Sequence, residues 1–352
     1  MVGIVFCNDL NTCPYIDKYL EILHQKKVSY EVIIWNRSGE KKQYPSNYLV
    51  FNEKSDIFIA QWKKVGAFIR FKSFLKRTII DRKYDKLIML STMPAVLCYN
   101  LLKKKYRGKY IFDFRDLSYE RYAFFKRIVK SIIDNSYFTC ISSPGFAEKL
   151  ELDSYIIAHN FRYRDLDNEL NEPNLCTNPI RLLHIGITRG EQFNKRLADI
   201  FGGDDRFQVN IIGSGNDTES FKSYIANKSN IEVRGTYNNM DKMSFIYDAS
   251  MLLYYYPGDY NCDSALANKY YDGLIYKKPL IGNINTYSGK RIQDKGLGIS
   301  LDIDDNHFAD KIYNYMMTLN QSVYMEAVAR EMNLVFKEDS AYLKNIREFL
   351  DE

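Results

Sequence analysis

A lysine and an aspartate lie three residues apart in the stretch ANKYYDGLIYKKPLIG, directly before a run typical of a buried strand. Lys269 and Asp272 are therefore one turn apart on the predicted helix. A carboxylate near the end of a strand can accept hydrogen bonds from two neighbouring hydroxyl groups, such as those of a ribose. The alternative is an ordinary Lys/Asp pair on the surface of a helix.

A second group of charges follows the strand-like run that ends in HIGITRGEQFNKRL. Gly186 lies at the strand end, Arg189 follows it, and Lys195 lies near the start of the next helix. Glycine allows a close approach to the backbone, and the arginine fork and lysine point charge suit a diphosphate.

Two further strand ends carry glycines. The segment IIGSGND contains Gly213 and Ser214, and IEVRG ends at Gly235. Backbone N–H groups in such loops can meet a nucleotide. Neither the loop in HIGITRG nor the loop in IIGSGND matches GxGxxG or a Walker motif. Each of them, taken alone, therefore also fits an ordinary strand-to-helix turn.

The elements that position these residues are continuous apolar strands separated by helices, a pattern that predicts parallel sheets covered on both faces. The first half is thus predicted to be a Rossmann-like domain, and the second half repeats the alternation. Predicted strands cover 2–6, 30–35, 86–90, 109–114, 137–142 and 155–159 in the first half, and 180–186, 207–213, 231–235, 250–256 and 278–282 in the second. Between them, NFRYRDLDNELNEPNLCTNP is polar and lacks periodicity, which indicates a linker.

Composition places the chain among globular proteins. Its 352 residues exceed one typical domain, and 46% of them are hydrophobic. No apolar run approaches the ~20 residues needed to span a bilayer, and the first residues lack the pattern of a signal peptide, so we expect a cytoplasmic protein. The six cysteines lack CxxC spacing and offer no zinc site with the four histidines; most are predicted to be buried.

The charge is distributed unevenly. Residues 1–170 contain 29 Lys and Arg against 19 Asp and Glu, or +10, whereas the remainder has 20 against 25, or −5. The stretch 61–86 alone holds nine basic and two acidic residues, with aromatic residues among them. We expect it to bind an anionic membrane surface; the alternative is a helix whose apolar face packs on the sheet. Nucleic acid is not expected, since no recognition motif accompanies the charge.

The chain resembles the retaining GT-B glycosyltransferases, in particular the family-4 group that builds bacterial surface polysaccharides. The resemblance rests on HIGITRGEQFNKRL, IIGSG, IEVRGTY, YDASMLLYYYPGDYNCDSALANKYYDGLIYKKPLIG and KGLGISLD, between Ile180 and Asp302. The first half matches only in architecture, with DFRDL similar to an Asp-containing segment of the family. The resemblance implies an α/β GT-B fold, two doubly wound Rossmann-like domains that face a central cleft.

The implied domains are an acceptor-side domain over 1–160, a linker over 161–178, a donor domain over 179–330, and a C-terminal helix over 331–352 that crosses back to the first domain. The implied chemistry is sugar transfer from a nucleotide sugar to a lipid-linked or saccharide acceptor, with retention and with neither metal nor cofactor. Arg189 and Lys195 would hold the donor diphosphate, and Asp272 would bind the ribose. The expected nucleotide site comprises Gly186, Gly213, Ser214, Gly235, Asp263, Ser264, Lys269 and Asp272.

The chain departs from the family pattern in four places. Asp272 replaces a glutamate, Lys277 stands where glycine is usual, and the position eight residues before Asp272 is Ser264, with Asp263 beside it. The Gly-Gly loop after the first strand is replaced by CNDLNTCP. The missing upstream acidic residue and the missing Gly-Gly loop fit a second hypothesis, a non-catalytic GT-B subunit that binds and stabilises a partner transferase. The presence of Arg189, Lys195 and Asp272 together argues against it. An epimerase or a phosphorylase on this fold is a third hypothesis.

Candidate residues in the first half are fewer. Asp116 follows a buried strand and is the expected base if the enzyme inverts configuration, while Asp113 lies within that strand. His159 lies at a strand end, where packing or capping is the alternative to function. The DxD string in RDLD falls in the predicted linker and is expected to be a solvated turn. The expected location is cytoplasmic, or peripheral on the inner face of the membrane.

Overall fold

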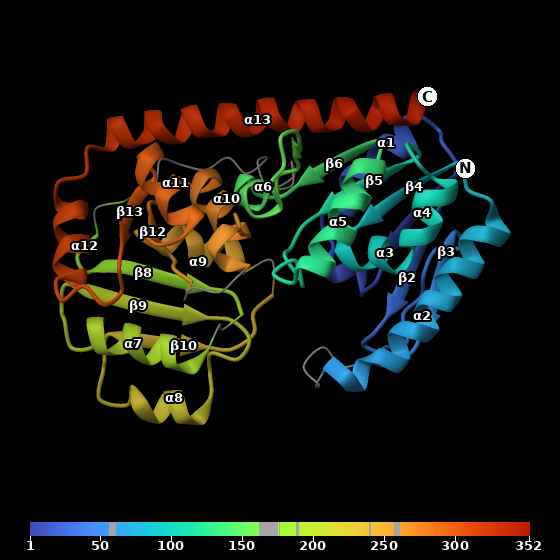
Figure 1. The fold of residues 1–352 in the computed structure, drawn as a ribbon. Helices are drawn as coiled ribbons and strands as arrows, with labels where there is room; N and C mark the ends of the chain where they lie inside the picture. Colours follow the sequence, from blue (N-terminus) through green and yellow to red (C-terminus); the bar gives the residue numbers. More distant parts are fainter. Residues whose placement is uncertain (56–60, 162–174, 176, 188–189, 239–240, 257–260) are drawn as a thin grey trace. The chain divides into compact units, whose positions relative to one another are not determined.

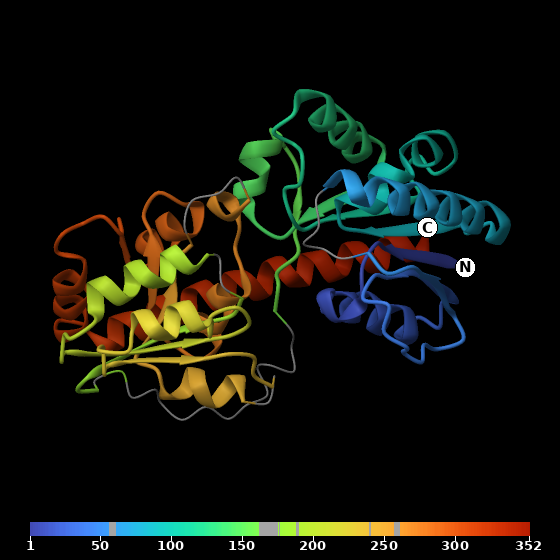
Figure 2. The same cartoon turned by 90° about the horizontal axis from the view of Figure 1, so that it is seen from below.

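The computed structural model describes residues 1–55, 61–161, 175, 177–187, 190–238, 241–256 and 261–352. The chain forms two compact units, Met1–His159 together with Lys337–Glu352, and Asn160–Phe336. Each unit is built on one parallel sheet, and Figures 1 and 2 show helices on both faces of each sheet.

The sheet of the first unit has seven strands in the order β3-β2-β1-β4-β5-β6-β7, all parallel. The strand order reverses between β1 and β4, and in such sheets ligands bind outside the carboxyl ends of the strands at this switch point. The strands are β1 (Val2–Phe6), β2 (Tyr30–Asn36), β3 (Tyr48–Asn52), β4 (Lys86–Leu90), β5 (Tyr110–Phe114), β6 (Phe138–Ile141) and β7 (Ile156–Ile157).

Alternate residues of the central strands face opposite sides of this sheet. On one side, Ile4 and Ile34 belong to a core cluster with residues of α1 and with Tyr342, Ile346 and Phe349 of the C-terminal segment. On the other side, Trp35 stacks on Phe71 of α2 with ring centroids 5.0 Å apart. The helices of this unit are α1 (Ile16–Gln25), α2 (Gln61–Arg82), α3 (Thr92–Leu97), α4 (Tyr99–Lys105), α5 (Ala123–Asn135) and α6 (Pro144–Leu150), with the 3-10 turn η1 (Leu10–Thr12).

The second unit has a six-stranded parallel sheet in the order β10-β9-β8-β11-β12-β13. Its switch point lies between β8 and β11. One contiguous hydrophobic cluster fills the unit and includes every residue of β11. The strands are β8 (Ile180–Ile185), β9 (Phe207–Ile212), β10 (Ile231–Arg234), β11 (Met251–Tyr254), β12 (Leu280–Asn283) and β13 (Gly298–Leu301).

Helices connect these strands and close the chain. They are α7 (Glu191–Phe201), α8 (Glu219–Tyr224), α9 (Lys242–Asp248), α10 (Asn268–Ile275), α11 (Tyr287–Lys295), α12 (Phe308–Met317) and α13 (Gln321–Asp351), with the 3-10 turn η3 (Cys262–Ser264). The last helix is a single element of 31 residues, and it begins at Gln321, before the predicted start at 331. The first unit includes the part of this helix from Lys337 onward.

The predicted fold class, α/β with two Rossmann-like sheets, is confirmed. Two strands were not predicted: β3 is a half-buried edge strand, and β13 lies in a segment used only for the family resemblance. The DxD string at 164–167 and most of the predicted linker lie outside the described residues.

Other expectations about the chain can be compared directly. Cys7, Cys13, Cys98, Cys140 and Cys262 are buried, as predicted, and burial raises the pKa of the Cys7, Cys13 and Cys98 thiols to about 12. Within the described ranges, no helix is long and apolar enough to cross a bilayer.

Candidate functional site

Lys269 and Asp272 both lie on α10, which follows β11 at the switch point of the second sheet. Both side chains are buried, with residue exposures of 5% and 7%. The alternative of a pair on an exposed helix surface is therefore wrong. Buried charges require specific partners. Even after the protein relaxes around it, an unpaired buried charge costs roughly several kcal/mol.

Two partners of Lys269 lie on β8 and directly after β11. Its ammonium lies 3.5 Å from Nδ1 of His184 and 4.8 Å from the ring centroid of Tyr256. Burial, and then the charge of Lys269, holds the pKa of His184 well below its usual value, so His184 is neutral. Within the described part of the chain, Nε2 of His184 has no hydrogen-bond partner. A Cβ placed on Gly186 would be 3.8 Å from Cε of Lys269, so the lysine stem lies beside the end of β8.

Asp272 is held from another helix. The Nζ atom of Lys242, at the start of α9, lies 2.7 Å from its Oδ1. Tyr237 is close enough that the charge of Asp272, after burial, contributes to raising the pKa of that phenol. The predicted ribose carboxylate thus already has a cationic partner, which sequence reasoning missed.

The turn that leads into α10 is ordered by Tyr254. Its hydroxyl accepts from the Ala267 amide at 2.7 Å and donates to the Ala265 carbonyl at 3.4 Å. Asp263 is half-buried and Ser264 is buried on the preceding 3-10 turn η3. Both predicted positions therefore lie on the segment between β11 and α10, at the same edge of the sheet as Lys269.

The glycine positions are explained by direct backbone contact between loops. Gly213 has a φ of +139°, and a Cβ there would lie 2.0 Å from the carbonyl oxygen of Gly186. The Asn216 amide donates to that same carbonyl at 3.0 Å and accepts from Asn194 of α7 at 3.0 Å. The ends of β8 and β9 are therefore joined closely, a geometry that only glycine permits at Gly213.

The last two predicted nucleotide-binding positions are Ser214 and Gly235. Ser214 is exposed in the turn after β9. A Cβ on Gly235 would lie 2.3 Å from a carboxylate oxygen of Asp217, so the Asp217 side chain lies directly against this glycine. Lys277, where the family usually has glycine, has a φ of +52°, the left-handed region that glycine adopts most readily.

Only one of the two predicted phosphate-binding cations lies within the described residues. Arg189 lies outside the described residues. Lys195 is half-buried on α7 and pairs with Glu191 at 2.7 Å. Glu191 also accepts from Thr218 at 2.7 Å and Ser220 at 2.8 Å, and these contacts lower its pKa to about 2. Glu191 is therefore a fixed anion beside Lys195.

In the first unit, Asp116 is exposed in the loop after β5. The neighbouring Asp113 is fully buried and holds Arg115 in a two-pronged ion pair, which makes it a structural residue. Glu120, which the sequence analysis did not single out, is buried in the same loop. Burial raises the pKa of the Glu120 carboxyl group. The Oε1 atom of Glu120 has no hydrogen-bond partner among the described residues.

His159 belongs to the packing of the first unit. Its Nε2 lies 2.9 Å from Glu338, and its carbonyl accepts from Lys18 at 3.2 Å. It thus joins the strand end to the C-terminal segment, as in the packing alternative. In the described ranges, no group of three or more His, Cys, Asp or Glu residues could hold a metal ion.

Comparisons with known proteins give one strong result. No protein-family model matches the chain, and no curated protein matches it in sequence. Solved structures do match. Anabaena HepE in complex with UDP has a TM-score of 0.67 at 9% identity, covering 99% of this chain and 100% of that one. The lipopolysaccharide outer core galactosyltransferase WaaB has 0.61 at 15% identity, covering 99% of each chain.

A third match is sucrose-phosphate synthase from Thermosynechococcus elongatus, with a TM-score of 0.65 at 11% identity over 97% of this chain and 99% of that one. At such identities the likeness establishes the fold. The chain therefore has the GT-B fold of glycosyltransferases, as its resemblance to the family predicted.

Proposed function

We propose that the protein is a glycosyltransferase that moves a sugar from a nucleotide-sugar donor to a lipid-linked or polysaccharide acceptor, with retention of configuration and without a metal. The observation that carries the proposal is the buried Lys269 and Asp272 on α10, at the switch point of the second sheet and beside Gly186. Anabaena HepE, which shares the fold, was solved with UDP, and this supports a nucleotide as ligand.

The proposed chemistry places the donor at the carboxyl ends of β8, β9 and β11. Asp272 accepts hydrogen bonds from the ribose hydroxyls, while Arg189 and Lys195 hold the diphosphate. As the bond between the sugar and the diphosphate breaks, the leaving group gains negative charge, and preorganised cations stabilise it. An ammonium has three donors, so Lys195 can keep Glu191 and still reach a phosphate.

A second candidate function has an observation in its favour. Lys195 and Asp272 already pair with Glu191 and Lys242. A GT-B subunit that only stabilises a partner transferase would need nothing from these charges beyond such internal pairing. The two hypotheses differ in whether the chain binds nucleotide at all.

The experiment combines calorimetry with a panel of nucleoside diphosphates and transfer assays with the matching nucleotide sugars. Arg189→Ala should weaken nucleotide binding and slow transfer, by about 2 to 4 kcal/mol in all, because the leaving group gains charge in the transition state. Asp272→Asn should lose about 1.5 to 3 kcal/mol, mostly as nucleotide affinity, because it removes a charged acceptor from the ground state.

The matched control is Arg181→Ala, which removes an exposed arginine from the amino end of β8, whereas the proposed donor site lies at the carboxyl end. Its nucleotide affinity should equal that of the parent. If Arg189→Ala and Asp272→Asn also bind nucleotide like the parent, the donor site is elsewhere and the partner-stabilising function is favoured.

We also propose that the basic stretch 61–86 attracts the protein to an anionic membrane surface, where a lipid-linked acceptor would lie. Phe68, Phe71 and Phe74 do not serve as lipid anchors, because they pack against Trp35 and Phe51. The side chains of Trp62, Lys63 and Lys64 lie outside the described ones. The support that remains is the exposed basic residues of α2, with exposed Val65 and Ile69; these basic residues are Arg70, Lys72, Arg77 and Arg82.

Neutralising Lys63, Lys64, Arg70 and Lys72 tests this proposal. Sedimentation with anionic vesicles should fall for the variant, and added salt should weaken the binding of the parent, because exposed charges are screened over about 10 Å at 0.1 M salt. Binding by the parent that is unaffected by salt, or no binding at all, would contradict it.

A further inference from the structure

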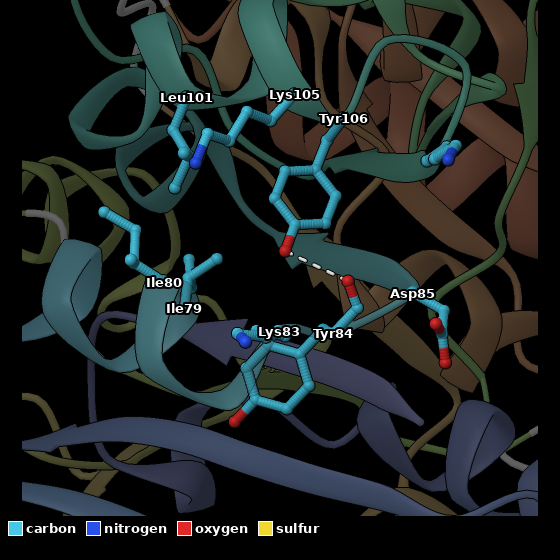
Figure 3. A pocket seen from close by; sticks show the side chains of 9 residues that line it. Ile79, Ile80, Lys83, Tyr84, Asp85, Leu101, Lys105 and Tyr106 are labelled. Carbon is cyan, nitrogen blue, oxygen red and sulfur yellow. Dashed lines mark hydrogen bonds between the residues drawn. The ribbon is translucent and has the colours of Figure 1, made fainter.

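A concave site lies within the first unit and includes residues 79–85, at the end of the basic stretch 61–86. A cavity of about 280 Å³ opens between the end of α2 and the end of α4. Figure 3 shows Ile79, Ile80, Lys83 and Tyr84 on one side of it and Leu101, Lys105 and Tyr106 on the other. Asp85 and Lys109 complete the lining.

The position of this cavity separates it from the candidate active site. Asp85 directly precedes β4 and Lys109 directly precedes β5, so the cavity lies at the amino ends of these strands. Ligands of doubly wound sheets bind at the carboxyl ends, where Asp116 and Glu120 follow β5. Whatever occupies this cavity is therefore not held by the loops that form the proposed transfer site.

The floor of the cavity is preformed. The Tyr106 hydroxyl donates to the Tyr84 carbonyl at 3.0 Å, and the Tyr84 hydroxyl donates to Glu31 at 2.5 Å. The Tyr84 ring packs so closely on β1 that a Cβ on Gly3 would lie 2.8 Å from it. A wall with so little freedom loses little conformational entropy when a ligand binds.

The charge of the lining is strongly positive. Lys83, Lys105 and Lys109 are exposed, and within the described ranges none of them forms an ion pair. The one carboxylate, Asp85, pairs with the N-terminal ammonium of Met1. Lys83 and Lys105 lie at the ends of helices, where a cation is favourable without any ligand. Lys109 directly precedes β5, and its charge, after that of the N-terminal ammonium, lowers the pKa of Asp85.

We propose that this cavity binds a phosphate group, with the apolar part of the same ligand resting against Ile80 and Leu101. Three lysines in the lining of one cavity favour an anionic group such as a phosphate mono- or diester, because an ammonium donates charge-assisted hydrogen bonds to phosphate oxygens. The volume lies just below the range of drug-sized pockets, which suits a headgroup-sized ligand. The phosphate can belong to a phospholipid headgroup or to a soluble phosphorylated metabolite.

The test measures binding of two probes to the full chain. Glycerol 3-phosphate in calorimetry represents the soluble source, and vesicles of equal parts phosphatidylglycerol and phosphatidylcholine represent the lipid source, with pure phosphatidylcholine as the blank. Lys83→Gln/Lys105→Gln/Lys109→Gln should weaken whichever probe binds by about tenfold, the scale for losing several charge-assisted contacts. The control Lys54→Gln/Lys104→Gln/Lys130→Gln removes the same charge from other exposed positions of this unit and should change binding less than about twofold.

A second variant separates a pocket from a diffuse charged surface. Leu101→Trp fills the cavity and keeps all three lysines, so it should weaken binding to a similar extent. The proposal is overturned if neither probe binds the parent, if the control triple loses as much as the lysine triple, or if Leu101→Trp binds like the parent. Nucleotide binding should be the same in all variants, so failure here is distinct from failure of the proposed transferase.

Discussion

Asp272 shows how a single residue of the proposed donor site is held before any ligand arrives. A nearly buried carboxylate needs a counter-charge, and Lys242 supplies it across 30 residues of sequence at 2.7 Å. Lys242 itself is about one-quarter exposed, so its loss is less costly than the loss of a fully buried partner.

Lys242→Met should therefore destabilise the region around α9 and α10 by about 1 to 3 kcal/mol, because it leaves the Asp272 charge without its cation. Hydrogen–deuterium exchange of peptides from 242–248 and 268–275 measures this, and exchange should be faster in the variant. Lys242→Met/Asp272→Asn should restore part of the protection, since the charge is removed with its partner. Unchanged exchange in the single variant would mean that the pair contributes nothing in solution.

The sequence could reveal some of the site residues and not others. Lys195 and Glu191 are spaced i, i+4 on one helix, so their pairing was readable from the sequence although it was not used. Lys242 carried no such signal, because its partner lies on another helix. The same holds for His184, which contacts Lys269 only because β8 and the start of α10 lie side by side at the switch point.

At the scale of elements, the site depends on how closely the loops after β8 and β9 approach. Gly213→Ala would bring a Cβ to 2.0 Å from the Gly186 carbonyl at a φ of +139°. We expect a loss of about 3 kcal/mol or more in stability, because both the strained backbone and the steric overlap act against the native loop. Thermal unfolding of the parent and the variant measures it.

The matched control for this substitution is Gly190→Ala. Gly190 has nearly the same φ, +137°, and a Cβ there would meet nothing within 4 Å. It therefore carries the backbone cost without the overlap, on the order of 1 kcal/mol. If the two variants are equally stable, the close approach of the two loops is not formed in solution.

Elements with strong apolar patterns were predictable, and those shaped by their neighbours were not. Strand β1, which is buried throughout, and β4, which is buried except at its first residue, were located to the residue. Edge strand β3 was missed because its residues are only half-buried, so hydrophobic periodicity is weak there. The C-terminal helix was expected over 331–352, but it starts at Gln321, because a boundary inside a continuous helical pattern is hard to locate from sequence.

At the scale of the whole molecule, the first unit needs a segment from the far end of the chain to complete its hydrophobic core. The first unit takes part of its core from the far end of the chain, since Phe349 lies against Tyr137 with ring centroids 5.2 Å apart and is 1% exposed. Lys86 of β4 also donates to the Phe349 carbonyl. The sheet of residues 1–159 therefore closes its hydrophobic core only when residues 337–352 are present.

Phe349→Ala should accordingly destabilise the first unit by about 3 to 5 kcal/mol, the scale for removing a large aromatic side chain from a core. Both tryptophans, Trp35 and Trp62, precede residue 160, so their fluorescence reports on this unit during urea unfolding, while circular dichroism reports on the whole chain. The fluorescence midpoint should fall, and a second, unshifted transition should remain in the circular dichroism. Val323→Ala is the control, because Val323 lies on the same helix with 57% of its surface exposed and should change stability by less than about 0.5 kcal/mol. A fluorescence midpoint equal to that of the parent would show that the C-terminal segment is not part of the cooperative core of the first unit.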